Sequence, residues 1–121
     1  MAARLFDRAQ VGACVAVLGP DGADRTLVVN THLKHIFGYE SSVPESQVLP
    51  FESARFVDPL ARSNLLERLG HDGAVADFLV RVRRVDFTPI WVEVTATAER
   101  QDGGSLLVEA LVRDVSDRKK L

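Results

Sequence analysis

Apolar residues cluster near the start of the chain in a pattern that predicts two β-strands. Residues Val11–Leu18 are almost all small or β-branched and apolar, and residues 19–22, which read Gly-Pro-Asp-Gly, form a dense cluster of turn formers. Thr26–Val29 is a second, shorter apolar run. The two runs are therefore predicted to be strands that a tight turn connects.

Two short helices are predicted on either side of these strands. Residues 1–10 place Leu5 and Phe6 on one side of a helical wheel, with charged residues on the rest, which is typical of an amphipathic helix. Thr31–Phe37 follows Asn30, whose side chain can cap a helix N-terminus. Gly38 can end that helix, because glycine readily adopts the left-handed conformation of helix C-termini.

The strongest helical pattern begins at Pro59, directly after Asp58 as a potential cap. Four leucines are spaced so that they build one apolar face before Gly70, where the helix is expected to end: Leu60, Leu65, Leu66 and Leu69. The segment that precedes this helix, residues 39–57, contains Pro44 and Pro50, which break any long helix. Short turns and loops are predicted there.

The last third of the chain predicts three longer strands, at Val75–Val85, Ile90–Arg100 and Ser105–Val115. Turn residues at 86–89 and 101–104 separate them, so consecutive strands are expected to pair as an antiparallel meander. Two strands, several short helices and three further strands make an α+β domain.

Composition and charge exclude several classes of function. A chain of 121 residues fits one domain, and 15 basic against 17 acidic residues leave no excess positive charge to attract nucleic acid. Cys14 is the single cysteine, so neither an internal disulfide nor a paired-cysteine metal site can form. The longest apolar stretch is far shorter than a membrane span, and no secretion signal is present, so we expect a cytoplasmic domain without membrane contact.

The order and spacing of several short motifs resemble a PAS domain, the sensory-box family of bacterial signalling proteins. The resemblance runs from about Val11 to the end of the chain. Its most specific part is residues 113–119, which read Arg-Asp-Val-Ser-Asp-Arg-Lys and are similar to the run that closes many PAS domains. The other matching segments are residues 19–22, 28–30, 37–39, 75–78, 81–84 and 91–94.

The resemblance implies a five-stranded antiparallel sheet with short helices packed on one face. It assigns residues 11–115 to the PAS domain, residues 1–10 to an N-terminal helix or linker, and residues 116–121 to the start of a helical linker. It also implies sensing of ligands or redox state and signalling by dimer rearrangement. The sequence departs from the family pattern at Phe87, where the turn usually carries glycine after aspartate, and residues 41–55 do not align.

The family register, with alternating side chains, gives the closing strands two faces. The face toward the helices is expected to be wholly apolar: Phe78, Val80, Val82, Val92, Val94, Ala96, Val108, Ala110 and Val112. The opposite face mixes large apolar and charged residues: Leu79, Arg81, Arg83, Trp91, Glu93, Thr95, Leu107, Glu109, Leu111 and Arg113.

A mixed face of this kind suits a second subunit or an amphipathic helix. We therefore predict a dimer or helix interface, with Leu5 and Phe6 covering part of the sheet. Its other predicted residues are Leu79, Trp91, Leu107 and Leu111. The alternative is an exposed sheet kept soluble by charge pairs.

Cofactor chemistry is disfavoured by the residues that related domains require. Flavin relatives that form a photochemical adduct need a cysteine on a helix and amide side chains on the inner sheet, whereas Cys14 lies on the first predicted strand and the inner face has no amide. Haem relatives often use a histidine on the helix that here follows Asp58, and this helix contains none. His32 and His35 lie about one turn apart, but further zinc ligands cannot be placed. We expect no cofactor or metal.

A small-molecule pocket between the sheet and the helices is the remaining candidate binding site. Its predicted lining is apolar and would accept an apolar ligand: Phe37, Phe56, Phe78, Val80 and Val92. A carboxylate ligand would need a basic partner, for which Arg55 or Arg62 is the candidate. A filled core, with signalling through dimer contacts, is the alternative.

The C-terminal segment is the predicted output. Ser116 can cap a helix that begins at Asp117, and the Asp114 carboxylate can tie the exiting helix to the sheet. We predict a non-catalytic sensory and dimerisation module whose partners are a second copy and a downstream effector, such as a histidine kinase or a cyclic-dinucleotide enzyme. The serines lie in loops without a nucleophile motif. The alternative is a small ligand carrier or enzyme that shares only the architecture.

Overall fold

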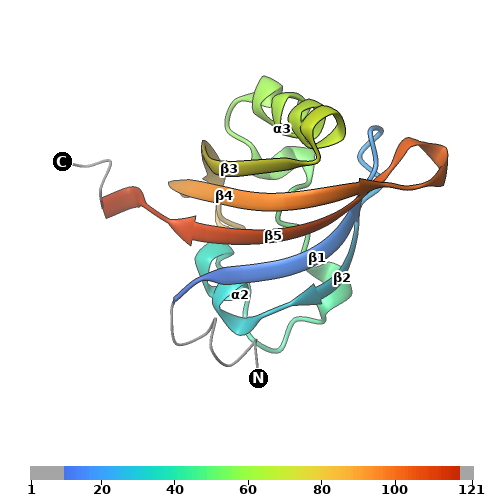
Figure 1. The fold of residues 1–121 in the computed structure, drawn as a ribbon. Helices are drawn as coiled ribbons and strands as arrows, with labels where there is room; N and C mark the ends of the chain where they lie inside the picture. The colour runs from blue at the N-terminus through green and yellow to red at the C-terminus, as the bar shows by residue number, and fades with distance from the viewer. Residues whose placement is uncertain (1–9, 118–121) are drawn as a thin grey trace.

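Five strands form one antiparallel sheet in the computed structural model, which describes residues 10–117 (Figure 1). Their spatial order is β2-β1-β5-β4-β3, so the last strand of the chain lies at the centre of the sheet. The strands are β1 (Gly12–Leu18), β2 (Arg25–Val29), β3 (Ala74–Arg83), β4 (Pro89–Arg100) and β5 (Leu106–Asp114). The predicted α+β class and the closing meander of three strands are confirmed.

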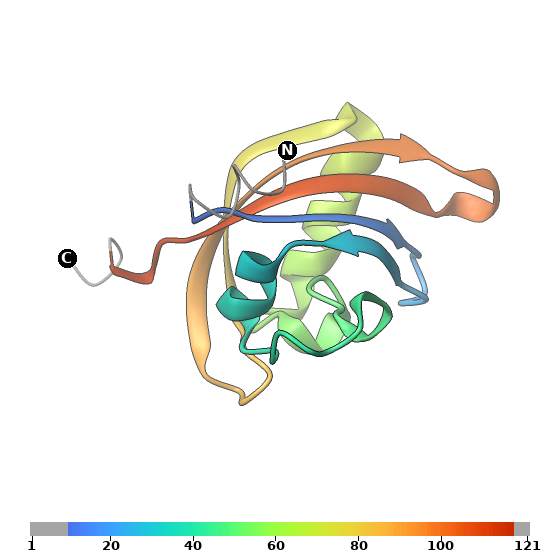
Figure 2. The ribbon, with the colours of Figure 1, turned by 90° about the horizontal axis from the view of Figure 1, so that it is seen from below.

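The helices and the segment that connects them lie on one side of the sheet (Figure 2). The helices are α2 (Thr31–Phe37) and α3 (Pro59–Asp72), and the short 3-10 turns are η1 (Glu45–Gln47), η2 (Ser53–Arg55) and η3 (Asp102–Gly104). The side of the sheet that faces away from α2 and α3 is called the outer face below. The predicted N-terminal helix, with Leu5 and Phe6, and the last residues of the predicted exit helix lie outside the described residues.

Helix α2 begins and ends where the sequence predicts, because a side chain caps its first turn and the backbone of a glycine closes its last. The Asn30 side chain accepts a hydrogen bond from the backbone N–H of Leu33 at 2.9 Å and another from that of Ala13 on β1 at 2.9 Å. Gly38 ends the helix with a φ of 83°, the left-handed conformation that glycine adopts at little cost. Asn30 therefore both caps α2 and fixes the start of this helix to β1.

Helix α3 corrects two predictions. It runs past Gly70 to Asp72 and ends at Gly73, which has the positive φ of 76° that a left-handed C-cap requires. Leu60, predicted on the apolar face, is 67% exposed. Five residues separate it from buried Leu65, which places the two about 140° apart around an α-helix. Arg62, one turn before Leu65, takes the buried position instead.

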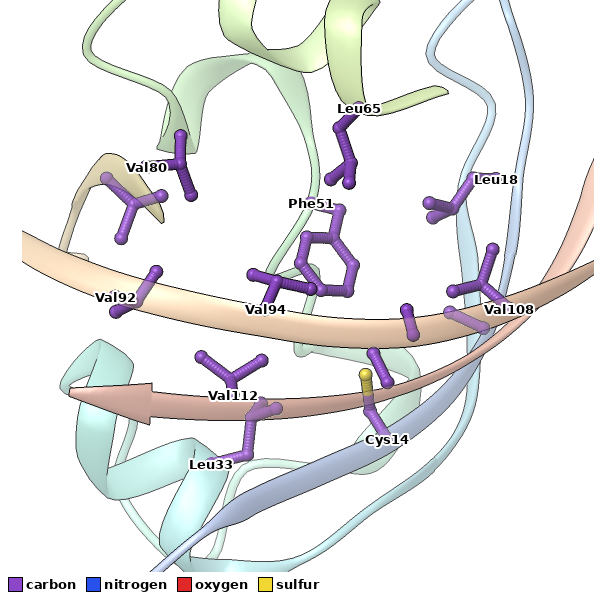
Figure 3. Packing of buried hydrophobic residues seen from close by; sticks show 14 of the residues in the cluster. Cys14, Leu18, Leu33, Phe51, Leu65, Val80, Val92, Val94, Val108 and Val112 are labelled. Atoms are coloured by element: carbon purple, nitrogen blue, oxygen red, sulfur yellow. The ribbon is translucent and has the colours of Figure 1, made fainter. Parts of the chain in front are cut away.

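The predicted alternation of the closing strands is confirmed. Eight of the nine residues predicted to face the helices are buried in one core, and Phe78 is half-buried under the guanidinium of Arg68, which lies 5.6 Å from the ring centroid. Figure 3 shows Phe51 and Leu65 pointing toward Val94 on the sheet. The side chains that point to the outer face include both large apolar and charged residues, as the register predicts; on β5, for example, Leu107 and Leu111 are interleaved with Glu109 and Arg113.

The turn between β3 and β4 carries strain. Phe87 has a φ of 71°, in the left-handed region that large side chains rarely adopt, and it is 70% exposed. The turn is nevertheless well bonded, because the Phe87 N–H donates to the Arg84 carbonyl at 2.9 Å and the Arg84 N–H donates to the Thr88 carbonyl at 2.9 Å. The geometry thus suits glycine, the residue that the family pattern has near this turn.

Replacing Phe87 by glycine is expected to raise the free energy of unfolding by about 1 kcal/mol, because glycine pays no left-handed penalty and the exposed ring buries little surface. Urea denaturation measures this difference. Phe87→Ala is the matched control, since it removes the ring and keeps the strained Cβ. Equal stabilities for the two variants would show that the backbone at Phe87 is not strained.

Candidate functional site

Two hydrogen bonds to the main chain of Trp91 hold the end of β5 to β4, and a third joins Ser116 to Asp114 within the exiting segment. The Val115 N–H donates to the Trp91 carbonyl at 2.9 Å, and the Trp91 N–H donates to the Ser116 hydroxyl oxygen at 3.0 Å. The Ser116 N–H in turn donates to the Asp114 carboxylate at 2.9 Å. These residues, Trp91 and 114–116, are called the exit junction below.

The exit junction brings together both predicted coupling residues and corrects the role of one. Ser116 is itself helical, together with Asp117, and its side chain bonds β4 rather than a helix N-terminus. The Asp114 carboxylate, at the last residue of β5, accepts from the Ser116 N–H two residues later. Both residues take part in the hydrogen bonds at the end of β5, and their coupling role stays a prediction; the partner Trp91 depends on pairing between β4 and β5.

Large apolar side chains are spread along the outer face, from the far end of β5 to the strand positions near the exit junction. Leu79 is 41% exposed and Leu111 is 37% exposed, while Trp91 and Leu107 are half-buried. The guanidinium of Arg81 lies 5.8 Å from the Trp91 ring centroid, within the range of a cation–π contact. The sheet therefore brings the four predicted interface residues within the described part of the chain onto one surface. Their role as an interface remains a prediction.

A shallow hollow of about 510 Å³ lies on the outer face over β4, β5 and β1. Side chains on that face and the backbone between them make up its lining, which is mainly apolar: Ala13, Cys14, Val15, Val28, Asn30, Thr95, Ala96, Thr97, Glu109, Ala110 and Leu111. Val28, on the edge strand β2, is 55% exposed and extends the apolar surface to the sheet edge. This outer hollow was not anticipated from the sequence, because it needs β1 beside β5.

The residues predicted to line an inner pocket are part of the packed core. Phe37, Phe56, Val80 and Val92 are each less than 5% exposed and belong to one hydrophobic cluster, and half-buried Phe78 packs against it. Some of the largest side chains beneath the sheet are completely covered, including Phe37, Leu33 and Leu65. The described side chains thus fill much of the space that a ligand would need.

A buried ion pair holds α3 to the turn between β1 and β2. One Nη of Arg62 lies 2.7 Å from the Asp24 carboxylate and donates to the Gly19 carbonyl at 3.2 Å, while Nε donates to the Phe51 carbonyl at 2.7 Å. Both side chains are at least nine-tenths buried. Arg62 is thus fully engaged in holding the fold, and its proposed role toward a carboxylate ligand would require breaking this pair. Arg55, the other candidate, is buried beside Glu52 and donates to the Arg83 carbonyl.

The pKa of the Asp24 carboxyl is raised from its usual value, mainly because burial penalises the charged form, and the nearby Arg62 offsets only part of that effect. The folded state therefore takes up a proton at a higher pH than the unfolded chain, whose pKa is about 3.9. As the pH falls through the raised native pKa, the Asp24 contribution to the free energy of unfolding increases. The stabilising contribution of Asp24 reaches its full value below the pKa of the unfolded chain.

We expect the stability difference between the unmodified protein and Asp24→Asn to move in favour of the unmodified protein as the pH is lowered from 7 toward about 4. Urea denaturation of both proteins across this range measures the difference, and the comparison cancels the other carboxylates. A difference that moves in favour of Asp24→Asn on acidification would show that the ion pair, rather than burial, dominates the titration of Asp24.

The remaining candidates for chemistry lie apart from one another. Burial raises the pKa of the Cys14 thiol to about 12, so this side chain is a small apolar residue of β1 at neutral pH. The rings of His32 and His35 lie 6.0 Å apart on α2. Among residues 10–117, no three histidine, cysteine, aspartate or glutamate side chains are grouped as a metal site would need. Within the same range, no helix is both long enough and apolar enough to cross a membrane.

Comparison with known proteins identifies the architecture. No family model and no curated protein matches the chain. Three similar solved structures are a PAS domain from Colwellia psychrerythraea, an RNA-binding light-oxygen-voltage receptor and a sensory box histidine kinase/response regulator from Burkholderia thailandensis E264.

The similarity to these structures covers nearly the whole chain. The Colwellia domain has a TM-score of 0.69 at 16% identity, over 97% of this chain and 96% of that one. The receptor has a TM-score of 0.67 at 24% identity, over 97% of this chain and 34% of the receptor. The Burkholderia structure has a TM-score of 0.63 at 22% identity, over 97% and 86%. At these identities the likeness establishes a shared fold.

Proposed function

We propose that this chain, which has the PAS fold, is a non-catalytic sensory and dimerisation module of a larger signalling protein. The observation that carries the proposal is the exit junction, in which the main chain of Trp91 holds both Val115 and Ser116. Trp91 also belongs to the outer face, beside Arg81. A contact made on the outer face therefore acts on the same residue that holds the C-terminal segment.

The outer face is the proposed surface for a second copy. Apolar surface is provided by Leu79, Leu107 and Leu111, and the outer hollow is a concave part of the same face. Charged residues lie between the apolar ones, and interfaces between folded subunits combine an apolar centre with a polar rim. Leu5 and Phe6 are proposed to cover part of the same face.

The module is proposed to work without resident flavin, haem or metal. Support comes from the core, where completely covered side chains such as Phe37, Leu33 and Leu65 occupy the space between sheet and helices. The high pKa of the Cys14 thiol argues against a nucleophilic or adduct-forming role for it. Signalling would then depend on contacts rather than on a cofactor, and a ligand at Phe37, Phe56, Phe78, Val80 and Val92 would require the core to open.

The proposed output runs through residues 116–121 into an effector that follows in the parent protein. A histidine kinase is the proposed effector class, since a similar solved structure is a sensory box histidine kinase/response regulator. A cyclic-dinucleotide enzyme is a second effector of the same kind. Asp114 and Ser116 are proposed to couple the sheet to that effector, because their side chains accept two of the three hydrogen bonds of the exit junction.

Replacing Ser116 by alanine tests the exit junction. The Trp91 N–H loses its acceptor, and a hydrogen bond of this kind contributes about 0.5–1.5 kcal/mol. We expect amide hydrogen exchange at Trp91 and Val115 to become about three- to tenfold faster, measured by NMR. Ser105→Ala, at the other end of β5, is the matched control and is expected to leave both amides unchanged. Unchanged exchange in Ser116→Ala would remove the exit junction as a coupling element.

A further inference from the structure

The hairpin between β3 and β4 bends out of the sheet toward the helices and meets the end of α2 (Figure 2). The Val85 N–H donates to the Phe37 carbonyl at 2.9 Å. The Arg84 guanidinium lies over Gly38, so closely that a Cβ at Gly38 would be 3.3 Å from its Nε. Within residues 10–117, the Val85 bond is the only backbone hydrogen bond between residues 84–88 and α2. The hairpin is therefore tied to α2 by few contacts.

The turn of this hairpin holds its own shape. The Arg84 N–H donates to the Thr88 carbonyl at 2.9 Å, and the Asp86 carboxylate accepts from the Thr88 N–H at 3.0 Å. Its apolar side chains contribute little to the core, since Phe87 is 70% exposed and Val85 is 36% exposed. The turn therefore keeps its conformation without support from the rest of the fold.

The strand pair Arg83–Pro89 marks the point where this turn joins the sheet. The guanidinium of Arg83 donates to the Phe56 carbonyl at 2.9 Å, and the Arg83 carbonyl accepts from the Arg55 guanidinium at 3.3 Å. Residues 84–88 lie beyond these bonds. Arg83 is thus a fixed point about which the turn can swing as one unit.

The contact with α2 carries a cost at Arg84. Its Nε is buried, and none of the residues 10–117 provides an acceptor for it. A buried donor without an acceptor loses the hydrogen bonds that water would supply. Turning the hairpin away from α2 returns this N–H to water, which offsets the loss of the Val85 bond. Opening of the hairpin therefore requires less free energy than unfolding of the sheet.

The hairpin adjoins the end of the core where the predicted ligand-lining residues lie. Val82, opposite Ile90, is the last core pair before the hairpin, and Phe56 forms an isolated bridge with Val82. Opening the hairpin would uncover this end of the core. The core residues around it are all apolar: Phe37, Phe56, Val80, Val82, Ile90 and Val92.

We propose that residues 84–88 form a gate at this end of the core, which swings away from α2 without unfolding of the sheet and admits a small neutral aromatic or aliphatic ligand. The class of ligand follows from the core residues behind the gate, which offer apolar surface. The gate lies on the helix side of the sheet, so it is independent of the proposed contact on the outer face. It gives the packed core a route by which a ligand can enter.

Amide hydrogen exchange at Val85 tests whether the gate opens by itself. After correction for intrinsic rates, the Val85 N–H is expected to exchange at least about tenfold faster than that of Val94, in the middle of β4. The Arg84 N–H should exchange more slowly than that of Val85, because its bond to Thr88 moves with the turn. Equal protection at Val85 and Val94, or exchange at Arg84 as fast as at Val85, overturns the gate.

Replacing Arg84 by methionine tests the cost at Nε. Methionine keeps an unbranched chain over Gly38 and removes the buried N–H, so exchange at Val85 is expected to slow by about five- to tenfold. Arg81→Met is the matched control, because it removes an arginine from the other face of β3, and it is expected to leave Val85 unchanged. Unchanged or faster exchange in Arg84→Met would contradict the cost assigned to Arg84, and with it the gate.

A reversible disulfide tests whether the gate controls entry. A Cβ at Gly38 would lie 3.4 Å from Val85 Cγ2, so the side chains of Gly38→Cys combined with Val85→Cys are close enough to be linked. Cys14 does not compete, because it is buried and its thiol has a pKa of about 12. The reduced double variant is the matched control, since it carries the same substitutions.

Indole is the probe in this experiment, and NMR shifts of the Val82 and Ile90 methyl groups report its entry. The shifts are expected in the unmodified protein and in the reduced double variant, and not in the oxidised one. Shifts of equal size in the oxidised and reduced forms, or no shifts in any of the three proteins, overturn the gate. The proposed function survives that failure, because signalling through the outer face and the exit junction does not need a ligand in the core.

Discussion

Replacing Arg62 by alanine is expected to lower the free energy of unfolding by about 3–5 kcal/mol, a large fraction of the stability of a domain of this size. The substitution leaves the Asp24 carboxylate buried without its cation, and it removes the donors to the Gly19 and Phe51 carbonyls. Buried polar groups that lose their partners carry the full cost of desolvation. Urea denaturation, followed by circular dichroism, measures the change.

A double variant separates the cost of the uncompensated charge from the cost of the other lost hydrogen bonds. Asp24→Leu combined with Arg62→Met removes both charges and keeps apolar volume, so it is expected to recover the part of the loss that comes from the unpaired Asp24 carboxylate, while the Gly19 and Phe51 carbonyls still lack a donor. A cost below about 1 kcal/mol for Arg62→Ala would mean that water reaches Asp24 in the folded state. In that case the ion pair would not hold α3 to the β1–β2 turn.

Replacing Leu111 by glutamate is expected to abolish self-association, raising the dimer dissociation constant by at least about 100-fold. Leu111 lines the outer hollow on the central strand and is 37% exposed, so its replacement places a charge in the middle of the proposed contact. Burial of an unpaired carboxylate there opposes association. Size-exclusion chromatography with light scattering measures the effect.

The fold of Leu111→Glu should remain intact, because the side chain lies on the outer face rather than in the core. Circular dichroism and the urea midpoint check this point. Leu60→Glu is the matched control, since it places the same charge at an exposed leucine on α3. Dimers that persist in Leu111→Glu at the affinity of the unmodified protein would remove the outer face as the contact surface.

Local signals made much of the fold predictable. Asn30 and Gly38 define α2 because capping and a left-handed C-cap depend only on residues near the helix ends. Alternation in β4 and β5 correctly assigned Val94 and Val112 to the core, since a strand with one buried face alternates whatever its neighbours are. These features need no knowledge of which strands pair.

Features that depend on tertiary contacts were missed or misplaced. Gly70 and Gly73 are the same residue type, and only the conformation of the folded chain selects Gly73 as the end of α3. The burial of Arg62 is visible only once Asp24, 38 residues earlier, lies beside it. Likewise, the Ser116 hydroxyl could be assigned to Trp91 only after β4 and β5 were paired.

The candidate site divides in the same way. The residues of the outer face could be predicted because side chains alternate between the two faces of a strand. The exit residues Asp114 and Ser116 follow from the resemblance of the closing motif to the family. The outer hollow was not readable, since it forms where β1 joins β5 through the pairing of Val15 with Glu109. The sequence therefore predicts which residues share a face of the sheet, whereas a hollow on that face can be located only when the order of the strands is known.

Amide hydrogen exchange at Val115 and Ser116, measured at protein concentrations well below and well above the dimer dissociation constant, tests most directly whether the outer face and the exit are coupled. The coupling through Trp91 predicts slower exchange at the high concentration in the unmodified protein and no concentration dependence in Leu111→Glu. Equal exchange rates at both concentrations, in a protein that sedimentation shows to dimerise, would contradict it.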